Sequence, residues 1–226
     1  MSVDRTKCDP ELGRRVHEYL ITKGVETPMV NNGLAASAKI EIIEQKYKEI
    51  MGVLGQDITD DSLAETPKRV AKMLVSETLW GLDIEAFPKV MIIENKMDYD
   101  EMVLEKAVTI NSWCEHHGLP ITGKVFVGYV PQNKVLGISK LNRISDYYAS
   151  RPQVQERLTA QICYALRYVL GIEEVSVVIE AHHGCVSMRG IKDASSMTVT
   201  SKLSPGLKAD AAARAEFFAH IAREKQ

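Results

Sequence analysis

Apolar residues recur at helical spacing through the first third of the chain. A first amphipathic stretch carries Leu12, Val16 and Leu20 and ends at Gly24. A second helix is predicted from about residue 37, where apolar side chains return every three or four positions: Ile40, Ile43, Tyr47, Ile50 and Met51. Thr66 followed by Pro67 is typical of a helix start, with Thr66 as its cap, and this helix should extend to Gly81. Residues 1–88 are therefore predicted to form a helical segment.

The remainder of the chain mixes the two-residue period of strands with further helices. Residues 121–130 alternate, with Ile121, Val125, Val127 and Tyr129 on one face. Other strands are predicted at 90–94, 102–110, 134–138, 175–181 and 195–202, and helices from about residue 139, over 152–171 and over 209–223. This order predicts an α+β domain over residues 89–226 with a mainly antiparallel sheet, because a parallel sheet needs strands and helices in regular alternation.

Composition and charge narrow the class of protein. The chain has 226 residues, of which 45% are hydrophobic and 26% charged, and this suits one large domain with a packed core. A formal net charge of −2 disfavours a general nucleic-acid binder, while a small cationic pocket for an anionic molecule stays compatible with it. The sequence contains no apolar run of the ~20 residues that a membrane helix needs, and residues 1–12 lack the apolar core of a signal peptide. We therefore expect a cytoplasmic protein without membrane or nucleic-acid partners.

Cysteine and histidine gather at two places in the sequence. Cys114, His116 and His117 form one cluster, and His182, His183 and Cys185 form the other. Four cysteines are too few for a disulfide scaffold, so the thiols should be free. A single Cys-x-x-His arises by chance, and buried cysteines are often inert packing. Two such clusters instead favour zinc held by three protein ligands, which leaves a fourth position open for catalysis.

A second set of residues suits a phosphorylated, planar ligand. Ser139, Lys140 and Arg143 fall at the predicted start of a helix, where backbone N–H groups favour phosphate. Arg189 follows the second cluster, and Arg69 lies on the helix over 66–80. For each cation taken alone, a solvated surface charge is the plain alternative. Glu156, beside Gln155, can accept two donors from the edge of a heterocycle such as guanine, although a carboxylate in a first helical turn also stabilises the helix dipole.

Four strings in this sequence resemble those of one enzyme family and follow its order. They are SWCEHH at 112–117, GISKLNR at 137–143, RPQVQERLT at 151–159, and EAHHGC at 180–185 with MRG at 188–190. From about residue 37 to its end the chain resembles GTP cyclohydrolase I. The resemblance implies a tunnelling fold, in which a four-stranded antiparallel sheet carries two long helices after an N-terminal helical segment. It also implies a homo-oligomer, a decamer of two stacked pentamers with active sites between subunits.

The resemblance implies a reaction and a role for each matching residue. GTP would be converted to 7,8-dihydroneopterin triphosphate and formate, the first step of pterin and tetrahydrofolate biosynthesis. The expected zinc ligands are Cys114, His117 and Cys185. His183 matches the acid at guanine N7, and His116 and Ser139 match the groups near the ribose oxygens. Glu156 with Gln155 matches the guanine contact, and the triphosphate contacts are Lys140, Arg143, Arg189 and Arg69, the last from a neighbouring subunit.

Three positions depart from the family pattern. Two other functions, one from another enzyme class and one without catalysis, are the alternatives. Gly118 stands where a large apolar residue is common, Gly184 separates His183 from Cys185, and His182 competes with His183 for the role at N7. One rival is the nitrile reductase of queuosine synthesis, which shares the tunnelling fold and uses a cysteine nucleophile with a nicotinamide cofactor. The other is a non-catalytic, zinc-stabilised assembly protein that binds nucleotide.

Overall fold

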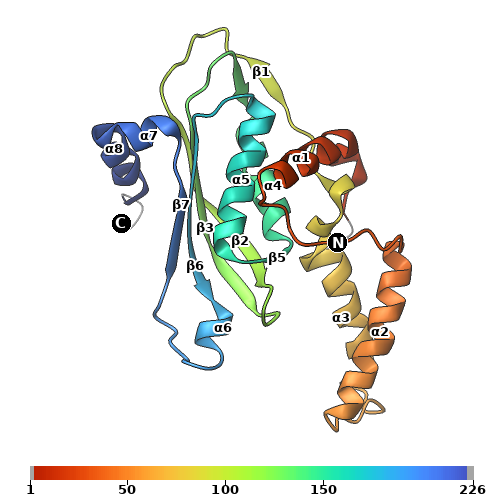
Figure 1. Cartoon of the computed structure of the whole chain (residues 1–226). Helices are drawn as coiled ribbons and strands as arrows, with labels where there is room; N and C mark the ends of the chain where they lie inside the picture. Colours follow the sequence, from red (N-terminus) through yellow and green to blue (C-terminus); the bar gives the residue numbers. More distant parts are fainter. Residues whose placement is uncertain (1–2, 223–226) are drawn as a thin grey trace.

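The computed structural model describes residues 3–222 and is built around one twisted sheet (Figure 1). The sheet order is β5-β2-β3-β6-β7, and the four long strands are antiparallel: β2 (Val103–Cys114), β3 (Pro120–Tyr129), β6 (Val175–His183) and β7 (Thr198–Lys202). A fifth strand of two residues, β5 (Pro152–Gln153), runs parallel to β2. Strands β1 (Ile92–Glu94) and β4 (Lys134–Leu136) pair in a separate small sheet. The predicted α+β class is confirmed.

Two helices cover one face of the main sheet and form the core with it. They are α4 (Ile138–Ala149) and α5 (Gln155–Leu170). The predicted alternation of β3 is confirmed, since Ile121, Val125, Val127 and Tyr129 are all buried in this core. Helix α5 starts three residues later than expected, because Pro152 and Gln153 pair with the end of β2 instead of joining the helix. It ends at Gly171, whose φ of 71° closes the last turn.

The C-terminal helices cover the opposite face of the sheet. The helix expected over 209–223 is confirmed by α8 (Ala211–Ala222), which begins two residues later, and residue 223 lies outside the described range. The structure adds a short helix, α7 (Pro205–Ala209), before it. Ser204 caps α7 by accepting from the N–H of Leu207, and the extended backbone of Asp210 separates the two helices. Phe217 packs here with Phe126 and Val178 of the sheet in a second apolar cluster.

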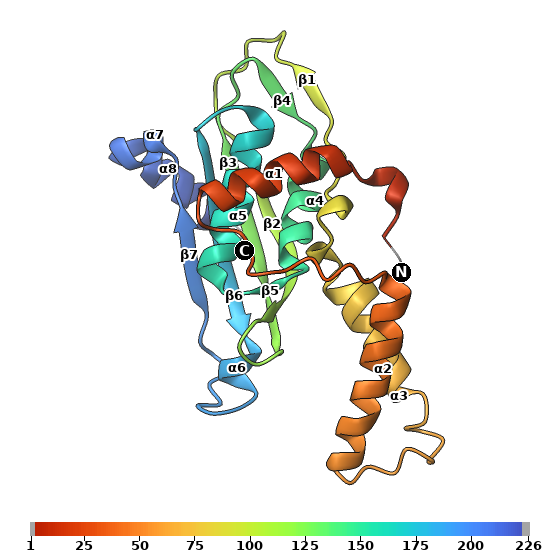
Figure 2. The same ribbon diagram turned by 45° about the vertical axis from the view of Figure 1, so that its right-hand side comes forward.

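The N-terminal region contributes one helix to the core and projects two others. After a 3₁₀ turn (Arg5–Lys7), α1 (Pro10–Thr22) buries Leu12, Val16 and Leu20 in the main core. Helix α2 (Ala36–Val53) and helix α3 (Thr66–Lys72), which continues as a π-helix (Met73–Thr78), extend away from the sheet as a hairpin (Figures 1 and 2). Two 3₁₀ turns, Trp80–Leu82 and Ile84–Ala86, return the chain to the core.

Two sequence-based details of this hairpin differ in the structure. Helix α3 takes Glu65 as its N-cap position and includes Thr66, so the predicted cap is one residue late. Of the predicted apolar stripe on α2, Met51 is the buried member, whereas Ile50 is half exposed. No helix within residues 3–222 has the length and apolar character needed to span a membrane.

Two adjacent phenylalanines test how the C-terminal helix is held. Phe217 is fully buried against the sheet, whereas Phe218 is 38% exposed. We expect Phe217→Ala to lower the free energy of unfolding by about 3–5 kcal/mol, because it leaves a cavity between α8 and the sheet. Phe218→Ala serves as the matched control and should cost far less in chemical denaturation. Equal losses for both variants would mean that α8 is not anchored through Phe217.

Candidate metal centre and catalytic groups

The three predicted ligands converge at one end of the sheet. The ligand atoms of Cys114, His117 and Cys185 all lie within 4.8 Å of one another. Cys114 ends β2, His117 lies in the turn that follows, and Cys185 lies in α6 (Gly184–Ser187), directly after β6. The spacing suits tetrahedral zinc, since bonds of roughly 2.0–2.3 Å place neighbouring ligand atoms about 3.5–4 Å apart.

Two glycines allow the ligand loops to take these positions. Gly118 has φ of +63° and closes the turn by donating its N–H to the carbonyl of Cys114 at 2.9 Å. This left-handed conformation is strained for a larger residue, which explains glycine there. A Cβ on Gly184 would lie 3.0 Å from the carbonyl oxygen of Pro120, so this glycine lets the α6 loop pack closely on the start of β3. Both departures from the family pattern therefore have a local structural reason.

The surroundings of Cys185 disfavour its thiolate. Burial is the main cause that raises the pKa of Cys185, and the neighbouring Cys114 raises it further. Cys114 is itself buried. Two thiolates this close repel one another, so both are stable together only when a cation offsets their charge.

Strand alternation separates the two candidate histidines after β6. Successive side chains of a strand point to opposite faces, so His182 and His183 diverge. His182 is exposed, and its Nδ1 lies 3.0 Å from the carbonyl oxygen of Ser196. His183 shares the inner face with Ala181, and its Nε2 lies 2.7 Å from Oε1 of Gln155. His183 is therefore the imidazole that faces α5. The three converging side chains, Cys114, His117 and Cys185, are called the metal cluster below.

The amide of Gln155 determines the tautomer of His183. Its nitrogen is directed at three acceptors, the carbonyl oxygens of Ile179 at 3.1 Å and Thr198 at 3.0 Å and the hydroxyl of Thr200 at 3.1 Å. Carbonyl oxygens only accept, so the oxygen of the amide must face His183. The Nε2–H of His183 then donates to Gln155, and Nδ1 is its free, basic nitrogen. Burial lowers the pKa of His183 more than the charge of Glu156 raises it, which favours the neutral imidazole.

A carboxylate supports the turn that carries His116. Both Nη atoms of Arg157 donate to Oε2 of Glu115, at 2.8 and 2.6 Å, and Oε1 of Glu115 lies 3.8 Å from Nε2 of His116. The Nδ1 of His116 in turn lies 3.9 Å from the sulfur of Cys114. His116 therefore borders the metal cluster without being one of its three ligands.

Arg189 also reaches the metal cluster. Its Nη1 donates to Nε2 of His117 at 2.8 Å, while Nδ1 of His117 lies 3.9 Å from the sulfur of Cys114. A neutral imidazole that gives Nδ1 to a metal carries its proton on Nε2 and cannot accept from a guanidinium. Metal binding through Nδ1 thus releases Arg189 for another acceptor.

The other predicted phosphate contacts lie far from this cluster within one chain. The amide nitrogen of Asn142, in the orientation that satisfies its hydrogen bonds, lies 3.2 Å from Glu105. Glu105 precedes Cys114 by nine residues on β2, which places the start of α4 about 25–30 Å from the metal end of the strand. Ser139, Lys140 and Arg143 therefore stand at the opposite end of the sheet. Arg69 is exposed on α3, in the projecting hairpin.

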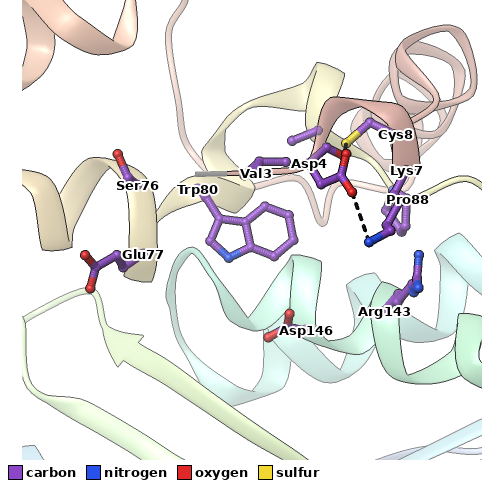
Figure 3. A pocket seen from close by; sticks show the side chains of 11 residues that line it. Val3, Asp4, Lys7, Cys8, Ser76, Glu77, Trp80, Pro88, Arg143 and Asp146 are labelled. Atoms are coloured by element: carbon purple, nitrogen blue, oxygen red, sulfur yellow. Dashed lines mark hydrogen bonds and ion pairs between the residues drawn. The ribbon is translucent and has the colours of Figure 1, made fainter. Parts of the chain in front are cut away.

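Arg143 instead lines a cavity of about 440 Å³ between α4 and the N-terminal region (Figure 3). Trp80 and Asp146 form part of its wall, together with the ion-paired Asp4 and Lys7. No metal ligand of the cluster lines this cavity. The sequence-predicted site is thus divided in two: the metal cluster with its histidines and Glu156 at one end, and the helix start with Ser139, Lys140 and Arg143 at the other.

Sequence reasoning missed the residues that hold the metal half in place. The Glu115–Arg157 ion pair and the pairing of Gln153 with Cys114 across β5 and β2 carry no motif of their own. Arg151, Pro152 and Gln153 belong to the string that carried the family resemblance, and Pro152 and Gln153 were expected to open the helix over 152–171, not to pair with β2.

The family model and the curated relatives agree on one family. The family model described as GTP cyclohydrolase I matches residues 43–222. The GTP cyclohydrolase 1 of Tolumonas auensis is 50% identical over 202 residues, covering 89% of this chain and 94% of that protein. The GTP cyclohydrolase 1 of Aliivibrio salmonicida is 48% identical over 206 residues, covering 91% and 95%. Among solved structures, the apo form of the archaeosine synthase QueF-Like gives a TM-score of 0.38 at 18% identity over 46% of this chain and 92% of that chain, too weak a likeness to define the fold.

The geometry separates metal ligands from the neighbouring histidines. We expect Cys114→Ser, Cys185→Ser and His117→Ala to lower the zinc content of the purified protein, because each removes one of three converging ligands. His116→Ala and His183→Ala should keep zinc near the wild-type amount in elemental analysis. Cys163→Ser is the control, since Cys163 is buried on α5 and donates to the carbonyl of Val175. Loss of zinc from the Cys163 variant alone would place the metal elsewhere.

Proposed function

The chain belongs to the GTP cyclohydrolase I family, and from that premise we propose that it hydrolyses and rearranges GTP to 7,8-dihydroneopterin triphosphate and formate with the help of zinc. The observation that carries this proposal is the convergence of Cys114, His117 and Cys185, with His116 next to Cys114 and with His183 at the end of the strand that leads to Cys185. Membership of this enzyme family also disfavours the rival readings as a nitrile reductase or a non-catalytic assembly protein. The reaction would be the first step of pterin and tetrahydrofolate biosynthesis.

The donor set fits a catalytic zinc ion. Two sulfurs and one imidazole nitrogen supply three ligands, and a fourth position is then open to water or substrate. Zinc held by these residues would supply a nucleophile at neutral pH, because such an ion lowers the pKa of water to about 7. The protein's own part is to hold this set rigidly, which the Gly118 turn and the close packing of Gly184 on Pro120 support.

His183 is proposed to exchange a proton with N7 of guanine through Nδ1. Its Nε2–H is committed to Gln155, whose own amide is held by Ile179, Thr198 and Thr200. Gln155, expected as a substrate contact, would thus serve the substrate by fixing this imidazole. His116 is proposed to act near the ribose oxygens together with Ser139 of another copy, since an imidazole titrates close to neutral pH.

Glu156 is proposed to recognise the guanine base. It is exposed on the first turn of α5, and it lies close enough to His183 for its charge to raise the pKa of that imidazole. A carboxylate there can accept from N1–H and the 2-amino group of guanine side by side, while adenine offers no such pair of donors. Recognition at Glu156 and proton transfer at His183 then act on one bound purine.

The triphosphate contacts are proposed to come from more than one chain. Arg189 belongs to the metal half, whereas Lys140, Arg143 and Ser139 lie at the far end of the sheet, beyond the reach of one nucleotide. A second copy that brings its α4 start to the metal end would complete the site, with Arg69 from a further copy. This division supports an assembly whose copies share their sites, and we propose the homodecamer of two pentamers that the family resemblance implies. In such a tunnelling-fold ring the sheets join edge to edge, so that strands such as β7 are not left unpaired.

The guanine contact predicts a defined substrate preference. GTP should be turned over and ATP rejected, because a site built for hydrogen bonds loses several kcal/mol with an analogue that lacks the donors. We expect Glu156→Ala to lower kcat/KM for GTP by at least about a hundredfold while the melting temperature changes little. The fluorescence of oxidised neopterin measures the product. Comparable turnover of ATP and GTP by the wild-type protein would contradict this role of Glu156.

The shared site predicts complementation between two inactive variants. Cys185→Ser damages the metal half, and Lys140→Ala damages the phosphate half. Oligomers reassembled from a 1:1 mixture should regain about a quarter of the wild-type activity, because about a quarter of random neighbours supply two intact halves. Each variant reassembled alone is the control. A mixture no more active than the sum of its parts would show that each chain completes its own site.

A further inference from the structure

A fully buried arginine lies immediately before the strand that pairs with the metal-binding end of β2. Arg151 is 1% exposed, and its guanidinium has a partner on every side. Its Nε donates to the carbonyl of Gly81 at 2.7 Å and its Nη2 to the hydroxyl of Tyr147 at 2.8 Å. Its Nη1 forms an ion pair with Glu26 and also donates to Thr27 at 3.3 Å. Such a charge is stable in the interior only while its partners remain in place.

Glu26 and Thr27 come from the N-terminal segment that follows α1. The second oxygen of Glu26 lies 3.0 Å from Nδ1 of His17, and the first also accepts from the backbone N–H of Thr27 at 2.8 Å. The hydroxyl of Thr27 accepts from Gln161 on α5 at 3.0 Å. Gln161 accepts in turn from Gln153 at 2.7 Å. The network therefore runs from the N-terminal segment to β5 and α5.

This network connects to the ligand turn after Cys114 and to the start of α5. Gln153 pairs in register with Cys114, and its carbonyl accepts from the N–H of Glu115 at 3.1 Å. Two residues later, Gln155 and Glu156 begin α5. The backbone between residues 151 and 156 thus connects the buried ion pair to the ligand turn and to the proposed guanine contact.

We propose that Arg151 and Glu26 are positioning residues for the guanine-recognising start of α5, and that the N-terminal segment is a working part of the active site. The ion pair sets where β5 ends and therefore where the carboxylate of Glu156 stands relative to bound guanine. This proposal rests on the proposed role of Glu156. Neither residue touches the substrate, and both act through the backbone of residues 152–156.

The test compares GTP with inosine triphosphate, which lacks the 2-amino group. If the ion pair aims Glu156, Glu26→Gln should raise KM for GTP about tenfold, because small misplacements of a recognition group are costly. It should also lower the preference for GTP over inosine triphosphate, with zinc content and oligomer size unchanged. A merely structural role would reduce stability or the fraction of active sites and leave that preference intact.

Three further variants make the outcome decisive. Tyr147→Phe and Thr27→Val each remove one hydrogen bond to Arg151 without stranding its charge, and each should shift the preference in the same direction by a smaller factor. They decide the question if Glu26→Gln does not fold. Glu85→Gln is the matched control, since it breaks the exposed pair of Arg14 and Glu85, 3.0 Å apart, which ties the same helix α1 to the Ile84–Ala86 turn. It should change nothing.

The proposal is overturned if Tyr147→Phe and Thr27→Val, and Glu26→Gln where it folds, keep the wild-type preference, or if Glu85→Gln shifts it equally. A separate measurement on Glu156→Ala distinguishes the guanine contact of Glu156 from the positioning role of Arg151 and Glu26. An unchanged preference in Glu156→Ala overturns the guanine contact itself. A changed preference there, with none in the network variants, overturns the positioning role alone.

Discussion

The short parallel pairing between β5 and the end of β2 is the constraint on which the candidate site depends. Trp113 and Cys114 pair with Pro152 and Gln153, and this contact ties the ligand turn to the start of α5. Without this pairing, the turn after Cys114 would have no backbone contact with the segment that opens α5, and no strand would fix the position of the first turn of α5. The ligand turn after β2 and Glu156 at the start of α5 keep their mutual positions because this two-residue pairing joins them, whereas His183 is placed by the register of β6 on β3. Arg151, which directly precedes β5, binds Gly81 and Glu26 through its buried guanidinium.

Much of the fold was predictable because periodicity reports which face of an element is buried. The alternation in β3 and the apolar spacing of α1 and α5 led to the α+β class, since those faces meet the core. Periodicity placed element boundaries wrongly where contacts with distant parts of the chain determine the backbone of a few residues. Pro152 and Gln153 join the sheet instead of opening α5, and the extended backbone of Asp210 delays the start of the last helix.

The candidate site was predictable in its chemistry but not in its assembly. Clustered cysteine and histidine indicated a zinc site, and the family resemblance implied Cys114, His117 and Cys185 as its ligands. The structure brings those three side chains together. Spacing along the chain could not show that Ser139, Lys140 and Arg143 stand at the other end of the sheet, because proximity in sequence to one motif says nothing about the far end of a strand. Nor could it distinguish His182 from His183, which required the pleat of β6 and the amide of Gln155.

The distance between the two halves of the site has consequences for mixtures of intact and defective chains and for activity at low protein concentration. On the proposed assembly, each chain donates its ligand turn to one neighbour and its α4 start to another. A chain that is damaged in both halves therefore disables two pockets, each shared with an intact sibling, so the fraction of lost pockets in a mixed population exceeds the fraction of such chains. For the same reason, a freshly released chain has no complete pocket, and chemistry begins only above the concentration at which copies meet.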